Sequence, residues 1–189
     1  MIIGVVGIQG AVSEHLDMLK KCNVDSLWIR KAEQLCGVNG LIIPGGESTT
    51  ISKLMRESSL FDSIVDLGKG GMPIYGTCAG LVLLAKQGCE NVKKTEPKLF
   101  GLMDMKICRN AFGNQKESFE AEIDFEGIGK YPGVFIRAPI IDKTWGNCKP
   151  LSFYDGKIVA AKQSNLLATS FHPELTDDIR LHEFFIDMI

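Results

Sequence analysis

The first half of the chain alternates short apolar runs with segments of helical periodicity, and this alternation restricts the fold more than any other feature. Residues 2–6 predict a buried strand and residues 25–29 a second strand; a short buried strand follows around Leu41 and another strand around Ile74. Residues 13–22 have a helical pattern with Ser13 as its expected cap, and further helices are expected between the later strands. Strands that alternate with helices pair in parallel, because a crossover helix returns the chain to the same end of the sheet.

The second half has a different pattern, with shorter apolar runs that are closer together. Five strand candidates occupy residues 105–109, 119–123, 134–136, 152–154 and 158–161. Asp155 and Gly156 predict a hairpin turn between the last two, so this region is expected to form a mixed or antiparallel extension. Residues 176–188 predict a closing helix, and residues 86–99 a variable surface loop. We therefore predict an α/β fold, a single three-layer domain over residues 1–189 in which helices flank a mostly parallel central sheet.

A cysteine stands at a predicted strand-to-helix turn. Cys78 lies between Gly76 and Gly80, after one apolar run and before another. The glycines allow a tight turn and close packing, while the N-terminus of the following helix favours a thiolate. The sequence thus predicts a nucleophile that can attack carbonyl carbon. A small buried cysteine with two packing glycines is the alternative.

Near the other end of the chain, His172, Pro173 and Glu174 follow an apolar strand-like run. Proline favours an extended preceding residue, and residues two apart in an extended segment face the same side. Glu174 can therefore accept a hydrogen bond from one ring nitrogen of His172 and leave the other for Cys78. Nucleophile, base and orienting carboxylate are what acyl transfer requires. The alternatives are a structural histidine and an acidic helix N-terminus.

A glycine pair supplies bare backbone in a third segment, residues 44–50. Its Gly46 N–H is expected to bind an oxyanion, with the Ala79 N–H as the second donor because Ala79 directly follows the nucleophile. The loops that hold Gln9, Gly46 and Cys78 all fall beyond the carboxyl ends of parallel strands, where open sheets form their sites. A turn followed by a Ser/Thr helix cap is the structural alternative, and such a cap is expected in any case at residues 48–50. A phosphate-binding loop is less favoured, because no Lys-Ser/Thr pair follows the glycines.

Charge and composition exclude several classes of partner. A net charge of −2 with scattered Lys and Arg gives no case for nucleic acid, and no apolar run approaches the ~20 residues of a membrane span. Six cysteines include no C-x-x-C pair, and the three histidines are not at metal-ligand spacing. We expect a cytoplasmic enzyme without metal, cofactor or disulfide, in which His15 and His182 are solvated or pack on their helices.

The segments described above resemble the class I (triad) glutamine amidotransferases. The shared motifs are Pro-Gly-Gly-Glu-Ser-Thr-Thr at residues 44–50, Gly-Thr-Cys-Ala-Gly at 76–80 and Phe-His-Pro-Glu-Leu at 171–175. More narrowly, the chain resembles the glutaminase subunits of pyridoxal 5'-phosphate synthase. That likeness rests on residues 4–15, with their Ile-Gln-Gly-Ala core, and on residues 44–50, Arg-Asn-Ala-Phe-Gly at 109–113 and Phe-Ile-Arg-Ala-Pro at 135–139.

The resemblance implies a flavodoxin-like fold and hydrolysis of L-glutamine to L-glutamate and ammonia through Cys78, His172 and Glu174. A γ-glutamyl thioester is the implied intermediate, and the ammonia is implied to pass to a synthase subunit in a hetero-oligomer. The resemblance assigns glutamine binding to Gly46, Glu47, Ser48, Arg109, Ile136 and Arg137. Without it, both arginines would be interpreted as surface ion pairs. Gln9 and Gly10 are the candidates for sensing the docked synthase.

Three other functions stay open at this point. A glutaminase subunit of another amidotransferase, such as imidazole glycerol phosphate synthase, shares the triad but not the blocks at residues 109–113 and 135–139. A cysteine peptidase or related hydrolase would use the same Cys/His pair without a glutamine pocket. A non-catalytic regulatory module is expected to have lost a triad residue, yet Cys78, His172 and Glu174 are all present.

Overall fold

In the described part of the chain, twelve strands form one sheet whose first part is parallel. The computed structural model describes residues 1–90, 92, 97–109 and 118–189, and all statements below concern these residues. The parallel part has the order β2-β1-β3-β4-β12. Its strands are β1 (Ile2–Val6), β2 (Asp25–Ile29), β3 (Gly40–Ile43), β4 (Ile74–Thr77) and β12 (Leu166–Thr169). The bounds of β1 and β2 are those predicted.

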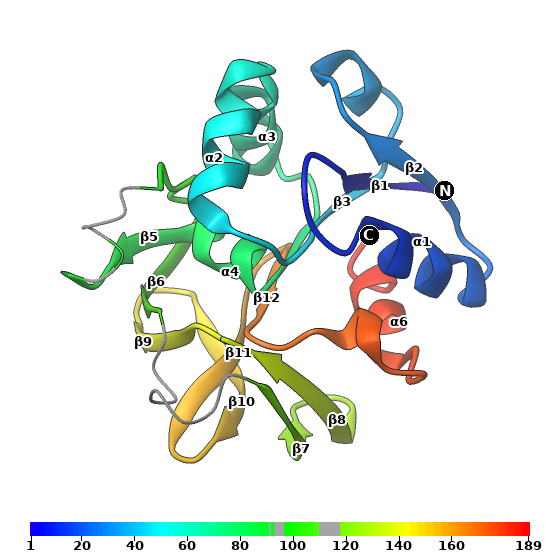
Figure 1. Cartoon of the computed structure of the whole chain (residues 1–189). Coiled ribbons are helices and arrows are strands. Elements are labelled where there is room, and N and C mark those ends of the chain that lie inside the picture. The colour runs from blue at the N-terminus through cyan, green and yellow to red at the C-terminus, as the bar shows by residue number, and fades with distance from the viewer. Residues whose placement is uncertain (91, 93–96, 110–117) are drawn as a thin grey trace.

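Helices cover both faces of the parallel strands, as Figure 1 shows. On one face lie α2 (Ser48–Glu57), α3 (Leu60–Lys69) and α4 (Ala79–Leu84); on the other lie α1 (Val12–Lys21) and α6 (Arg180–Ile186). Strand β3 supplies side chains to both cores because its residues alternate in direction: Leu41 and Ile43 pack towards α2 to α4, and Ile42 towards α1 and α6. The predicted three-layer α/β arrangement is confirmed.

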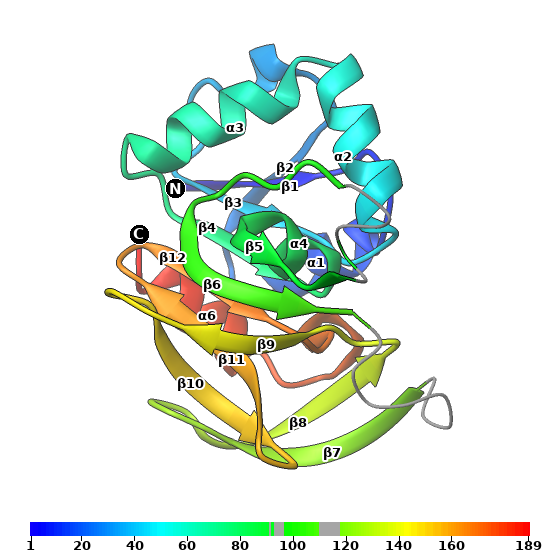
Figure 2. The same ribbon diagram turned by 90° about the vertical axis from the view of Figure 1, so that its left-hand side faces the viewer.

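The remaining strands form the mixed extension that the sequence predicts. They are β5 (Ala85–Gly88), β6 (Met103–Cys108), β7 (Ser118–Phe125), β8 (Gly129–Ile136), β9 (Ile140–Thr144), β10 (Lys149–Tyr154) and β11 (Lys157–Gln163). From β12 the sheet continues antiparallel through β11, β10, β7 and β8, while β5, β6 and β9 branch from β11 (Figure 2). Asp155 and Gly156 both have positive φ and join β10 to β11, as the hairpin prediction requires.

The predicted cap of the first helix was wrong. Ala11 is the N-cap residue of α1 and makes no side-chain cap bond, while Ser13 lies within the first turn and donates to the Glu14 carboxylate. The predicted closing helix was too long at its start. A short 3-10 helix, Pro173–Leu175, comes first, and α6 begins only at Arg180.

Residues 86–99 are not simply a surface loop. Three of them belong to β5, which pairs in parallel with β6, and Val92 is buried in the core. Residues 91 and 93–96 lie outside the described part, as do residues 110–113 of the Arg-Asn-Ala-Phe-Gly block. In the described ranges, none of the helices has the length and apolar character needed to cross a membrane.

Candidate active site

Cys78 occupies a strained turn between β4 and α4. Its backbone has φ 49° and ψ −98°, a conformation that costs a residue with a Cβ of order 1–3 kcal/mol and that clusters at active sites. The turn is held by a hydrogen bond from Cys78 N to the carbonyl of Thr169 at 2.8 Å. A Cβ at Gly80 would lie 2.1 Å from the carbonyl oxygen of Ile43, and one at Gly76 would lie 2.5 Å from the Gly80 carbonyl carbon. Both glycines are therefore needed for close packing, as predicted.

His172 and Glu174 form a buried pair beside this turn. The His172 Nδ1–H donates to Glu174 Oε1 at 2.7 Å, and the two residues are 8 % and 5 % exposed. The backbone N–H of His172 donates to the Val134 carbonyl at 2.8 Å, which ties the histidine to β8. The spacing predicts this contact between His172 and Glu174, but the predicted extended backbone was wrong. After His172 the chain makes the 3-10 turn Pro173–Leu175 instead.

The surroundings of this pair favour its charged form. Burial alone lowers the pKa of His172, but hydrogen bonding to Cys78 and Glu174 and their charges outweigh it and raise the pKa to about 10. Burial also works to raise the pKa of Glu174, yet the electrostatic interaction with His15 and the hydrogen bond from His172 keep that pKa below its ordinary value. The carboxylate is thus ionised at neutral pH and can orient the imidazole.

The loop between β3 and α2 closes over the pair. A Cβ at Gly45 would lie 2.4 Å from His172 Cε1 and 3.3 Å from Cys78 Cβ, so only glycine fits there. Gly46 follows with φ 150°, a conformation that L side chains rarely adopt. The bare backbone of both residues therefore lies next to the Cys78–His172 pair. Gly45 was not among the predicted site residues, although it belongs to the glycine pair on which the oxyanion prediction rested.

Glu47 anchors the other end of this loop. Its carboxylate accepts from Thr49 N at 3.0 Å, and from Thr50 N and Thr50 Oγ1 at 2.7 Å each, so Glu47, and not a Ser or Thr, caps α2. Arg109 pairs with the same carboxylate at 2.9 Å. Burial pushes the pKa of Glu47 upward, but the bonds from Thr50, Thr49 and Arg109 together lower it to about 2.

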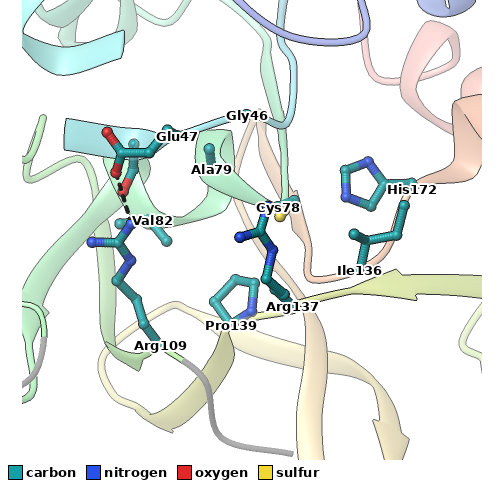
Figure 3. Close-up of a pocket in the computed structure, with 11 residues that line it drawn as sticks. Gly46, Glu47, Cys78, Ala79, Val82, Arg109, Ile136, Arg137, Pro139 and His172 are labelled. Atoms are coloured by element: carbon teal, nitrogen blue, oxygen red, sulfur yellow. Dashed lines mark hydrogen bonds and ion pairs between the residues drawn. The ribbon is translucent and has the colours of Figure 1, made fainter. Parts of the chain in front are cut away.

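A cavity of about 350 Å³ joins these elements (Figure 3). That volume suits a ligand the size of a free amino acid. In Figure 3 the Glu47–Arg109 pair lies at one end and His172 at the other, with Cys78 and Arg137 between them. The cavity is lined by Gly46, Glu47, Ser48, Cys78, Ala79, Val82, Arg109, Ile136, Arg137, Pro139 and His172.

Nine of the predicted site residues therefore line one cavity, although they come from distant parts of the chain. Glu174 lies behind His172 rather than at the cavity surface. Val82 and Pro139 were missed by the sequence interpretation. Val82 is four residues after Cys78 on α4, which places both on one helix face, and Pro139 ends the block at residues 135–139. The roles of all these residues in binding and catalysis stay predictions.

Two polar side chains in the cavity have no partner within the described part of the chain. Ser48 Oγ is buried without a hydrogen bond, and the Arg137 guanidinium makes neither a hydrogen bond nor an ion pair. Arg137 also has φ 42°, which marks a second strained residue at the cavity wall. Because Arg109 is already paired with Glu47, Arg137 is the cation left for an anionic ligand.

The loop with Gln9 and Gly10 does not line the cavity but packs behind it. Gly10 has φ 113°, and a Cβ there would lie 1.8 Å from the Gly45 carbonyl oxygen. A Cβ built on Gly46 would lie 3.7 Å from the Gln9 carbonyl oxygen. The backbone of this exposed loop therefore contacts the Gly45–Gly46 turn directly.

Comparison with known proteins shows the family of this chain. The model of the SNO glutamine amidotransferase family matches residues 5–189. A relative from Desulforamulus reducens, pyridoxal 5'-phosphate synthase subunit PdxT, is 50 % identical over 191 residues that cover all of both chains. The PdxT subunit of Archaeoglobus fulgidus is 46 % identical over 194 residues, which cover all of this chain and 98 % of that protein.

Solved structures show the same fold. A crystal structure of a glutamine amidotransferase superposes with a TM-score of 0.94 at 40 % identity and covers all of this chain and 98 % of its own. The structure of PurLQS from Thermotoga maritima superposes with a TM-score of 0.66 at 13 % identity, and the match covers 98 % of this chain and 97 % of that one. The second likeness concerns the fold alone.

Proposed function

The chain belongs to the SNO glutamine amidotransferase family, and from that premise we propose that Cys78, His172 and Glu174 hydrolyse L-glutamine to L-glutamate and ammonia for a pyridoxal 5'-phosphate synthase subunit. The observation that carries the proposal is the position of a strained cysteine and a carboxylate-bound histidine at one amino-acid-sized cavity. The named relatives favour pyridoxal 5'-phosphate synthase over imidazole glycerol phosphate synthase as the destination of the ammonia.

The first chemical step forms an acyl-enzyme. His172 takes the proton from the Cys78 thiol, which its raised pKa favours, and the sulfur attacks the side-chain amide carbon of glutamine. Glu174 holds the imidazole in the tautomer whose Nδ1 carries hydrogen, so that Nε2 faces the reacting atoms. His172 then gives the proton to the amide nitrogen, the C–N bond breaks and ammonia leaves. A γ-glutamyl thioester remains on Cys78.

The second step releases glutamate. Water loses a proton to His172 and adds to the thioester carbon; the C–S bond then breaks and the proton returns to sulfur. Both tetrahedral intermediates carry an oxyanion, for which the backbone N–H groups of Gly46 and Ala79 are the proposed donors. Their support is that both residues line the cavity beside Cys78.

Recognition of the amino-acid end is assigned mainly to Arg137 and Ser48. The free guanidinium of Arg137 suits the α-carboxylate, and the unpaired Ser48 hydroxyl can bond either end of the amino acid. Arg109 and Glu47 neutralise one another, so we place them at the wall as a structural pair that also contacts the ligand. Ile136 adds an apolar wall against the ligand's methylene groups.

The exposed loop of Gln9 and Gly10 is the proposed point at which docking of the synthase influences the site. Its contact with Gly45 and Gly46 means that moving it also moves the oxyanion turn. The proposal includes a cytoplasmic location. Its support is that the chain's six cysteines all lie in the described ranges and none of them forms a disulfide.

Glutamate release from glutamine, with and without a pyridoxal 5'-phosphate synthase subunit, tests this function. We expect hydrolysis that the synthase stimulates and that Cys78→Ala abolishes. A rate of glutamine hydrolysis that does not change when the synthase subunit is added would contradict the assigned partner but not the assigned hydrolysis. Cleavage of peptides without cleavage of glutamine would indicate a peptidase, and no hydrolysis in either condition would indicate a regulatory module.

Binding is tested separately by Arg137→Ala. Loss of a charge-assisted bond to the carboxylate should raise KM for glutamine roughly 10- to 100-fold, with a smaller effect on kcat. Arg56→Ala is the matched control, because Arg56 is exposed on α2 and does not line the cavity. An unchanged KM in Arg137→Ala would refute the assignment of the carboxylate to this residue.

A further inference from the structure

A chain of buried polar side chains continues from Glu174 away from the cavity. Behind the carboxylate lie His15 on α1 and His182 on α6, both 0 % exposed. They were expected to be solvated or to pack, and the structure excludes the first possibility. Two histidines without contact to solvent need partners for their ring nitrogens, since an unpaired buried polar group costs about 1–3 kcal/mol.

The distances define the order of this chain. His15 Nε2 lies 3.4 Å from Glu174 Oε2 and 3.3 Å from Thr77 Oγ1, the hydroxyl of the residue before Cys78. On the other side of the ring, His15 Nδ1 lies 3.0 Å from His182 Nε2. Among the described residues, neither His182 Nδ1 nor Glu174 Oε2 has a hydrogen-bond partner, so the approach of His15 Nε2 to Glu174 Oε2 at 3.4 Å is an electrostatic contact. This row of side chains thus crosses the interior from the cavity to the last helix, in the order His172, Glu174, His15 and His182.

Both outer histidines are neutral in this setting. Burial is the main cause that lowers the pKa of each ring, with a value of about 3 for His182. The titratable groups that face the pair are Glu174, His172, Glu14 and the edge of Tyr75, and the attraction of the two carboxylates does not outweigh burial. Each neutral ring then carries one N–H, and only two arrangements along the chain are possible.

The carboxylate decides between them. If His15 carried its hydrogen on Nδ1, its Nε2 lone pair would face the negative Glu174 oxygen at 3.4 Å, and the hydrogen of His182 would stand unpaired on Nδ1. If both rings carry hydrogen on Nε2, His182 donates to His15 Nδ1 and His15 presents N–H to Glu174 Oε2 and Thr77 Oγ1. The second arrangement replaces a repulsion with an attraction and leaves no buried donor unpaired.

We propose that His15 and His182 are positioning residues for the reaction. His182 fixes His15 as the Nε2–H tautomer, and this N–H holds Glu174 Oε2, so that Oε1 stays aimed at His172 Nδ1. The proposal rests on the function proposed above, because it gives these two histidines the task of positioning Glu174 of the proposed triad. Neither histidine touches the cavity or a reacting atom.

Histidine ring NMR tests the tautomers directly on the full chain. The chain has only three histidines, so a ¹⁵N-histidine-labelled sample gives three ring systems, which single His15→Gln and His182→Gln variants assign. We expect both outer rings to be neutral Nε2–H tautomers between pH 6 and 8. An Nδ1–H tautomer or an imidazolium at either position would overturn the proposal.

Glutaminase kinetics, measured on the complex of this chain with the synthase subunit, test the positioning role. Misplacing Glu174 should lower kcat for glutamine roughly 10- to 100-fold in His15→Leu with little change in KM. His182→Leu should reduce kcat less, and His182→Gln should restore most of it, because the glutamine amide can still donate to His15 Nδ1. Met18→Leu is the control, a volume-conserving change at a buried residue on the same helix.

The outcomes separate this proposal from the proposed function. A wild-type protein without glutaminase activity contradicts the function, whereas an active wild type with equal kcat in His15→Leu overturns the positioning role alone. If His15→Leu does not fold, the pair His182→Leu and His182→Gln decides. Glutamine can donate a hydrogen bond to His15 Nδ1 and leucine cannot, so equal kcat in these two variants refutes the positioning role.

Discussion

Replacing Gly80 by alanine tests how tightly the fold holds the nucleophile turn. The new Cβ would lie 2.1 Å from the Ile43 carbonyl oxygen, where an ordinary contact needs more than 3.4 Å. Helix α4 therefore has to move away from β3 by about 1 Å or more, and Cys78, which precedes its first residue, moves with it. A displacement of about 1 Å at reacting atoms can lower the rate 100-fold.

Two effects on stability oppose each other in this variant. Alanine is favoured over glycine inside a helix by up to about 1 kcal/mol, but overpacking against a backbone carbonyl costs about 1–3 kcal/mol and occasionally more. Since β3 is fully buried and cannot yield easily, we expect a net loss of about 1–2 kcal/mol in the free energy of unfolding.

Urea unfolding and glutamine hydrolysis measured on the same samples provide the assay. Gly70→Ala is the matched control: Gly70 ends α3 with φ −75°, and its added Cβ would have no neighbour closer than 3.3 Å. We expect the control to keep wild-type kcat and a free energy of unfolding within about 0.5 kcal/mol. A Gly80→Ala protein with wild-type kcat and stability would refute the argument that this close approach positions Cys78.

Three further predictions concern single side chains of the site. Cys78→Ala should abolish glutamate release yet unfold at nearly the same urea concentration, because alanine keeps a Cβ at the same positive φ; residual turnover would remove Cys78 as nucleophile. Glu47→Ala should lose about 1 kcal/mol of stability with the cap of α2, whereas an unchanged urea midpoint would show that the cap bonds contribute nothing. The raised pKa of His172 predicts a contribution to stability that is complete below its unfolded pKa of about 6.5 and is lost as pH rises through about 10. The difference in unfolding free energy between wild type and His172→Asn should therefore shrink from pH 6 to pH 10, and a constant or growing difference would contradict the sign.

The parallel part of the sheet could be predicted because its signals are local. Strand β1 coincides with an apolar run, and β2 has the predicted bounds although only Ile29 of its five residues is buried. Strand β9 was missed because it lacks such a pattern: of its five residues only Ile141 is fully buried, and the others are polar or half-exposed. The late start of α6 depends on side-chain bonds of Thr176 and Asp178, which no periodicity reveals.

The site was predictable where one short motif contains the reason for it. The glycines around Cys78 predict its tight turn, and the spacing of His172 and Glu174 predicts their contact, although not the 3-10 turn through which it forms. The cap of α2 was not predictable in this way, because Ser48 and Thr49 are better cap residues by preference than Glu47, and the pairing with Arg109 favours the glutamate. His15 and His182 are 167 residues apart, so their contact exists only once α1 and α6 pack on the same face of the sheet.

Mass spectrometry of the acyl-enzyme tests the central claim most directly. The chain is mixed with glutamine and the synthase subunit, quenched with acid during turnover and digested, and each of its six cysteines is examined. We expect one glutamyl group on the peptide that holds Cys78 and none on the other five cysteines. Turnover of glutamine with the glutamyl group on another residue, or undiminished turnover in Cys78→Ala, would contradict it.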